Sequence, residues 1–189
     1  MFGKACPFRM QTIWCKKRVI LWCVVGFVLW LLLHKAQYNV RFEAVVKKSE
    51  AIEVWEYVAD FSNLKRLNPT IKEFSIEAES GNYDHWKYTV HYTEFLSHLP
   101  SIENYAVAHY QVKPLSKTSY IIQSTHRTCL YTSLACVDSV SSFTFEQQGD
   151  STLCIEDVTY ECPVIFSKFC EKEVWYQRRE IMKNLQSAF

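Results

Sequence analysis

Residues 49–69, SEAIEVWEYVADFSNLKRLNP, decide the fold of this chain. Ser49 is suited to cap a helix, because its hydroxyl accepts an amide proton of the first turn. An apolar stripe at helical spacing follows, formed by Ile52, Trp55, Val58 and Ala59. Ser62 is placed to cap a second short helix, which Asn68 ends because proline at position 69 disfavours helical geometry in the residue before it. Two such short helices cannot bury their apolar faces alone, so we expect them to cover another element.

The sequence around this helix pair alternates in the manner of strands with one buried face. The clearest case is residues 83–95, where every second side chain from Trp86 to Tyr92 would face inward. The same pattern predicts strands over residues 38–46, 71–79, 83–95, 102–112, 119–130, 140–146 and 152–161. A final helix of about 25 residues should begin at Pro163, with an apolar stripe interrupted near Arg178.

The helix-pair sequence resembles the opening of the START-like superfamily, also described as polyketide cyclase/dehydrase and lipid transport proteins of the SRPBCC type. The resemblance rests on Val54 and Trp55 in the first helix, on the Asp60-Phe61 turn and on Pro69. It covers residues 38–188. It implies an α+β helix-grip fold, in which a curved antiparallel sheet of six or seven strands surrounds the long C-terminal helix and two short helices follow the first strand. Such a fold usually keeps an apolar cavity of a few hundred Å³.

The N-terminal part contains an uncharged apolar run over residues 19–33. About 15 residues of helix reach roughly 22 Å, and snorkelling basic residues at both ends could close the gap to the ~30 Å hydrocarbon core. We therefore expect a juxtamembrane segment at residues 1–18, a transmembrane helix at 19–35 and the START-like domain at 38–189. A cleaved signal peptide and a buried helix of the domain are the alternatives.

Charges on both flanks of the apolar run bear on the side of the membrane. The near flank favours one side, and Arg41, Lys47 and Lys48 farther along nearly offset that bias. Lys16, Lys17 and Arg18 precede the apolar run and favour a cytosolic N-terminus, so the domain would lie in the lumen of a secretory-pathway membrane such as the endoplasmic reticulum, or outside the cell. In that case Cys129 with Cys136, and Cys162 with Cys170, have feasible disulfide spacings, and Cys154 would be the free thiol. In the cytosol all five would be small apolar packing residues.

A ligand wall is expected from the large residues that should face inward. They are Trp86, Tyr88, Val90, Tyr92, Tyr120, Ile122, Phe143, Phe145, Tyr160, Phe166, Phe169 and Trp175. The tyrosine hydroxyls would orient a polar head group, and the final helix with a loop over residues 96–103 would form the lid. The alternation alone favours a solid core built from the same residues, and the ligand wall is what the resemblance to the START-like fold implies.

Several functions are disfavoured by composition. The formal net charge is +1 and the domain has no basic run, which argues against nucleic-acid binding. The six histidines show no ligand spacing, so we expect neither a metal nor another cofactor. Glu156 or Asp157, in the middle of a strand, could point inward and act as a base or bind a head group, but the alternation favours an interpretation in which they face water.

The resemblance, taken with the N-terminal apolar run, implies a membrane-anchored protein that binds, and could transfer, a hydrophobic small molecule such as a lipid or sterol, in a cavity between the sheet and the C-terminal helix. An enzyme of the cyclase/dehydrase type is an alternative, which the lack of a clustered titratable pair disfavours. An interaction domain with a filled core is the other alternative.

Overall fold

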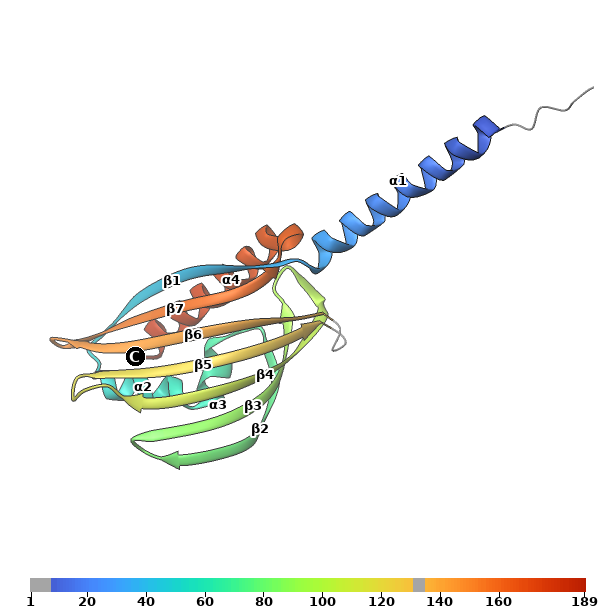
Figure 1. Cartoon of the computed structure of the whole chain (residues 1–189). Helices are drawn as coiled ribbons and strands as arrows, with labels where there is room; N and C mark the ends of the chain where they lie inside the picture. Colours follow the sequence, from blue (N-terminus) through green and yellow to red (C-terminus); the bar gives the residue numbers. More distant parts are fainter. Residues whose placement is uncertain (1–7, 131–134) are drawn as a thin grey trace, which may run out of the picture.

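The computed structural model describes residues 8–130 and 135–189, and it shows one curved sheet with helices on its concave side (Figure 1). The strands are β1 (Lys35–Lys47), β2 (Ile71–Asn82), β3 (His85–Leu96), β4 (Leu99–Pro114), β5 (Ser119–Leu130), β6 (Ala135–Gln148) and β7 (Ser151–Pro163). They pair antiparallel in the order β1-β7-β6-β5-β4-β3-β2. The expected sheet of six or seven antiparallel strands is confirmed.

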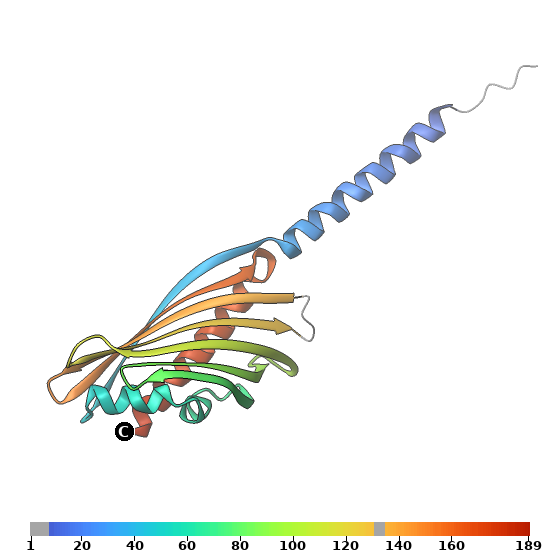
Figure 2. The ribbon, with the colours of Figure 1, turned by 60° about the horizontal axis from the view of Figure 1, so that its bottom comes forward.

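The helices are α1 (Phe8–Leu33), α2 (Ala51–Ala59), α3 (Phe61–Leu67), the short 3₁₀ helix η1 (Val164–Phe166) and α4 (Ser167–Ala188). Figure 2 shows α4 running along the inside of the sheet, and α2 and α3 lie near the C-terminal end of α4, at the end of the sheet away from α1. The C-terminal helix is 22 residues long and begins later than expected, because β7 continues to Pro163 and η1 follows it.

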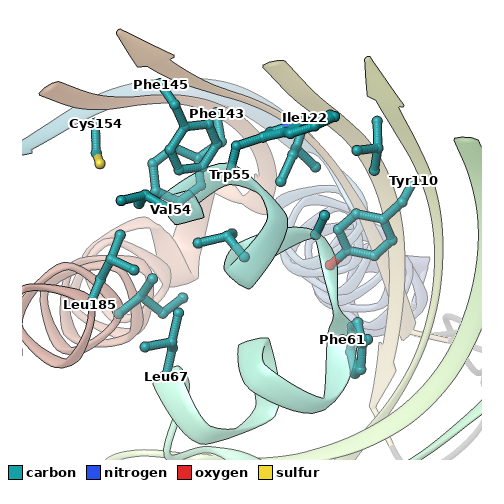
Figure 3. Close-up of a cluster of buried hydrophobic side chains, with 14 of the residues drawn as sticks. Val54, Trp55, Phe61, Leu67, Tyr110, Ile122, Phe143, Phe145, Cys154 and Leu185 are labelled. Atoms are coloured by element: carbon teal, nitrogen blue, oxygen red, sulfur yellow. The ribbon is translucent and has the colours of Figure 1, made fainter. Parts of the chain in front are cut away.

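The core lies where α2, α3 and α4 meet the concave face of the sheet (Figure 3). The predicted stripe of α2 is confirmed, since Trp55 and Val58 are buried there. Tyr88, Val90 and Tyr92 of β3 are buried as the alternation predicts. Burial of each such side chain contributes about 1.5–3 kcal/mol, which explains why the helix pair is fixed against the sheet.

The caps differ from those expected. Helix α2 has Glu50 at its N-cap and no side-chain cap, because the Ser49 hydroxyl instead donates to the Val46 carbonyl and to Thr152. Helix α3 is capped by Asp60, whose carboxylate accepts from the Ser62 amide. A carboxylate two residues earlier thus fills the role predicted for Ser62.

The prediction of a lid loop over residues 96–103 is wrong. β3 ends at Leu96 and β4 begins at Leu99, so a tight hairpin replaces the loop. The carboxylate of Glu173 in α4 fixes this hairpin, accepting from the amides of Ser97 at 2.7 Å and His98 at 3.0 Å.

The N-terminal helix α1 extends away from the domain (Figure 1). Its large apolar side chains between residues 19 and 30 are exposed. In the part of the chain that the structure describes, none of the helices has both the length and the apolarity that crossing a membrane requires, so the transmembrane helix expected at residues 19–35 is not found.

Two disulfides are present among the described residues. Cys129 bonds to Cys136 across the end of the β5–β6 hairpin, and Cys162 of β7 bonds to Cys170 of α4. Cys154 is a free, buried thiol as expected, and burial raises its pKa to about 12.

Candidate functional site

A buried ion pair joins the C-terminal helix to the sheet. The Arg178 guanidinium of α4 donates to Glu156 Oε1 of β7 at 2.9 Å, and the Ser141 hydroxyl donates to the same oxygen at 2.7 Å. Glu156 is 2% exposed. The interruption of the α4 stripe at Arg178 is therefore a contact with the sheet. The interpretation that the carboxylates of β7 face water is right for Asp157 and wrong for Glu156.

A small hollow lies beside this pair, which we call the inner cavity. It measures about 20 Å³ and is lined by Val58, Leu64, Tyr110, Ile122, Ser124, His126, Ser141, Phe143, Glu156, Arg178 and Ile181. Within the described residues, Glu156 Oε2 makes no hydrogen bond although it is buried. The inner cavity has room for about one water molecule, much less than the few hundred Å³ expected between the sheet and α4.

A second buried carboxylate, Glu94 of β3, lies near the same arginine. Its Oε2 accepts from the Gln177 side chain at 3.3 Å and from the Thr70 hydroxyl at 3.5 Å. Burial raises the pKa of Glu94 to about 7, although Arg178 acts in the opposite direction. The pKa of Arg178 stays above its ordinary value, because attraction by Glu156 and other neighbours outweighs the effect of burial.

His126 of β5 completes the polar interior. Its Nδ1 lies 3.1 Å from the Tyr92 hydroxyl and its Nε2 lies 2.8 Å from the Ser124 hydroxyl. Burial and the nearby Arg178 charge lower the pKa of His126 to about 3, so the ring is neutral near pH 7. Among the described residues, the interior beside the inner cavity thus places Arg178 near Glu94, Glu156 and a neutral histidine, and it has little free space.

A larger pocket opens at the edge of the grip, which we call the edge pocket. It has a volume of about 410 Å³ and lies between the end of α2, the β2–β3 turn and the end of β4. Its lining residues are Trp55, Glu56, Ala59, Asn82, Tyr83, Trp86 and Val112. Most of this wall is apolar, and Trp55 forms its floor, being 2% exposed.

The β2–β3 turn that forms the rim depends on Gly81. Its φ is +99°, in the region that favours glycine, and a Cβ there would meet the His85 carbonyl oxygen at 1.9 Å. The Asn82 side chain accepts from the His85 amide at 3.1 Å and closes the turn. The tight turn carries Tyr83 over the pocket, where its ring meets Trp55 edge-on with 5.8 Å between centroids.

The twelve residues predicted to form a ligand wall divide between several places. Trp86 lines the edge pocket, while Ile122 and Phe143 line the inner cavity. Six others are buried in the packed core or in the small cluster under β1 and β7, namely Tyr88, Val90, Tyr92, Tyr120, Phe145 and Tyr160. Phe169 is half-buried, and Phe166 and Trp175 are exposed. The structure thus does not bring them together as one wall, since most are packed in the core and two are exposed, and their contact with a ligand stays a prediction.

Of the residues that line the edge pocket, only Trp86 was predicted from the sequence to contact a ligand. Tyr83 falls on the outward face of the alternation predicted for residues 83–95, and Glu56 lies on the polar face of α2, so neither belonged to a face predicted to be buried. The signal that could have found them is the Gly81-Asn82 turn, which brings this hairpin over the end of α2. Within residues 8–130 and 135–189, no cluster of three or more His, Cys, Asp or Glu is placed to hold a metal ion.

Comparisons with known proteins identify the fold. No protein-family model matches the chain, and no curated protein matches it. Among solved structures, a protein from Thermus thermophilus superposes with a TM-score of 0.60 at 13% identity, over 79% of this chain and 95% of its own. Norcoclaurine synthase from Thalictrum flavum gives 0.56 at 14% identity, over 82% and 86%. Ara h 8.0201 gives 0.55 at 12% identity, over 81% and 97%. With its strand order and inner helix, the chain has the same helix-grip fold as these proteins.

Proposed function

We propose that the domain binds a hydrophobic small molecule, and that the apolar body of this ligand occupies the edge pocket. The observation that carries the proposal is an open pocket of about 410 Å³ whose floor is Trp55, on a helix-grip scaffold. Ligand sites are typically concave, mostly apolar and about 300–1,000 Å³ in volume. The edge pocket meets these criteria, whereas the inner cavity of about 20 Å³ does not.

The expected affinity is moderate. A ligand that buries about 200 Å² of apolar surface gains roughly 5 kcal/mol from removal of that surface from water. The loss of translational and rotational freedom takes back much of this gain, so polar contacts at the rim must add to it. Glu56, Asn82 and the Tyr83 hydroxyl are the polar groups that the rim offers.

The test is binding of the neutral dye Nile red, together with mass spectrometry of molecules that copurify with the full chain. Trp86→Ala removes a wall of the edge pocket and should lower both signals at least fivefold. Trp175→Ala removes the same side chain from α4, where it packs on Phe42, and is the matched control. Equal binding by the two variants, or greater loss in the α4 variant, would contradict the edge-pocket location.

We also propose that α1 holds the domain at a membrane. Large apolar side chains of α1 between residues 19 and 30 are exposed, and the turn beside its end continues this surface. The Val164 amide donates to the His34 carbonyl at 3.0 Å, so Ile165 and Phe166, 52% and 49% exposed, lie next to the end of α1. Contiguous apolar surface of this kind marks a lipid or protein contact.

The proposed side is the lumen of a secretory-pathway membrane, such as the endoplasmic reticulum, or the cell exterior. Support comes from the two disulfides, which persist in oxidising compartments. The chain should cofractionate with membranes at physiological salt, and thiol alkylation in intact cells should leave four cysteines protected until reduction. Val24→Arg with Val28→Arg should release the chain, and Leu115→Arg, on an exposed turn, should not.

An acid–base enzyme is the second candidate. The raised pKa of Glu94 favours it, because a catalytic base works best with a pKa near the working pH. The position of Glu94 disfavours it, because this buried side chain lines neither the edge pocket nor the inner cavity, so α4 would have to move before a ligand reached it. A relative in fold, norcoclaurine synthase, is an enzyme by its name. If Glu94 removes a ligand proton, incubation of the ligand in D₂O should exchange a carbon-bound hydrogen, and Glu94→Gln should abolish the exchange. A ligand recovered without deuterium would exclude this role.

A further inference from the structure

The edge pocket has an uneven charge. Among the described residues that line it, Glu56 alone carries a charge, and no lining residue is a lysine, an arginine or a histidine. The remaining wall is aromatic or aliphatic apart from Asn82 and the Tyr83 hydroxyl. A ligand anion would therefore meet a like charge without a compensating cation, whereas a ligand cation would meet an opposite charge.

The carboxylate of Glu56 is held at the rim by a specific contact. The Tyr83 hydroxyl donates to Glu56 Oε1. This bond raises the pKa of Tyr83 to about 12, so the phenol keeps its proton at neutral pH. An ionised carboxylate has about four acceptor sites, and one hydrogen bond leaves most of them for a ligand. Tyr83 thus fixes the negative charge without neutralising it.

The aromatic walls are fixed as well. The indole N–H of Trp55 donates to the Ile121 carbonyl at 3.4 Å, so its polar edge is engaged with β5. The Trp55 ring stacks on Tyr120 with 4.8 Å between centroids, and Trp86 packs on Tyr88 at 4.7 Å. Aromatic faces carry a negative quadrupole, which attracts a cation placed within about 6 Å of the ring centre.

We propose that the edge pocket selects an organic cation with an apolar body, in the manner of an aryl or alkyl quaternary ammonium. The apolar part fills the pocket above Trp55, and the cationic group lies between the Trp86 ring and the Glu56 carboxylate. Hydrophobic anions such as fatty acids are disfavoured by Glu56. This inference rests on the proposed function, because it names the ligand class of the same pocket.

The test compares three probes on the full chain in nonionic detergent: phenyltrimethylammonium, its neutral isostere tert-butylbenzene, and benzoate. The first two differ only in whether nitrogen or carbon is the central atom. Binding is followed by the indole ¹H–¹⁵N signals of Trp55 and Trp86, assigned with single Trp→Phe variants. We expect the cation to bind about tenfold more tightly than its isostere and benzoate to bind weakest.

Two variants separate charge from shape. Glu56→Gln keeps an acceptor for Tyr83 but removes the charge, and it should reduce the preference for the cation to about twofold. Glu53→Gln removes an exposed carboxylate on the same helix that does not line the pocket, and it should leave the preference unchanged.

The outcomes distinguish this inference from the proposed function. If the cation and its isostere bind equally to the wild-type chain, the inference is overturned and the apolar binding site stands. If the preference survives in Glu56→Gln, the carboxylate does not cause it and the inference is overturned in the same way. If no probe shifts the two indole signals, both the inference and the edge pocket as a binding site are refuted.

Discussion

Replacing Arg178 by methionine should be one of the most damaging single changes in the domain. The variant leaves Glu156, 2% exposed, with only the Ser141 hydroxyl as a partner on Oε1 and with no partner on Oε2 within the described residues. A charge-assisted hydrogen bond contributes about 1.5–3 kcal/mol, and an unpaired buried carboxylate adds its desolvation. We therefore expect Arg178→Met to lower the free energy of unfolding by about 3–5 kcal/mol.

The double variant tests the cause of this loss. Replacing Glu156 by methionine as well removes both charges and fills the space with apolar atoms, so the double variant should lie within about 1 kcal/mol of the wild-type chain. The coupling energy of the two changes should then be at least about 2 kcal/mol. A matched control is Arg41→Met, because the exposed pairs of Arg41 with Glu43 and Asp157 should together contribute less than about 1 kcal/mol.

The assay is urea unfolding of the full chain in nonionic detergent, followed by tryptophan fluorescence and circular dichroism. Similar slopes with denaturant would show that the variants unfold by the same transition. The reasoning is refuted if Arg178→Met costs no more than Arg41→Met, or if the two charge replacements simply add. Either outcome would mean that other groups in the interior stabilise the charge of Glu156 when Arg178 is absent.

The remaining predictions concern pH, the disulfide and a helix cap. The pKa of Glu94 in the folded chain, about 7, lies above its ordinary value of 4.5, so its stabilisation is complete below about pH 4.5 and is lost as pH rises through 7. The loss is at most about 3 kcal/mol, and Glu94→Gln should flatten this part of a stability-versus-pH curve; an unchanged curve would contradict the assignment. Replacing Cys162 and Cys170 by serine removes a disulfide that joins residues eight apart in the sequence, and it should lower the free energy of unfolding by about 2–3 kcal/mol. The double serine variant of Cys129 and Cys136 is the comparison. Asp60→Ala removes the cap of α3 and should cost about 1 kcal/mol in urea unfolding, whereas Ser62→Ala should cost less.

The pH prediction depends on groups from several elements around Glu94. Gln177 and Arg178 of α4 and Thr70 before β2 favour its charged form, and Glu173 of α4 opposes it. A shift of the titration to higher pH in Arg178→Met would follow from the loss of the cation. If that titration stays in place, the burial of Glu94 alone sets its pKa.

Local periodicity predicted the parts of the fold that depend on local chemistry. The stripe of α2 and the alternation of β3 both follow from burial of one face, and the structure confirms both. The cap of α2 could not be predicted in this way. Ser49 has the right chemistry for a cap, but Thr152, 103 residues away, offers its hydroxyl another partner. Tertiary contacts of this kind have no signal near Ser49 in the sequence.

The buried ion pair shows a different limit. Its two signals were visible, since Arg178 interrupts an apolar stripe and Glu156 lies in the middle of an alternating strand. Deciding that they meet requires the position of α4 along β7, which the pattern does not contain. The volume of the cavity between the sheet and α4 could not be predicted either, because it depends on how the side chains pack in that space and not only on which residues face it.

The same pair explains why a ligand should prefer the edge pocket to the interior. A ligand of several hundred Å³ would have to enlarge the inner cavity, and movement of α4 away from β7 would separate Arg178 from Glu156. Such a separation costs about 3–5 kcal/mol, similar to the roughly 5 kcal/mol that burial of the ligand would gain. The disulfide between Cys162 and Cys170 also fixes the start of α4 to the end of β7. The edge pocket is already open, so a ligand can bind there without moving α4 and without breaking the ion pair. We therefore expect binding at the edge pocket rather than in the interior.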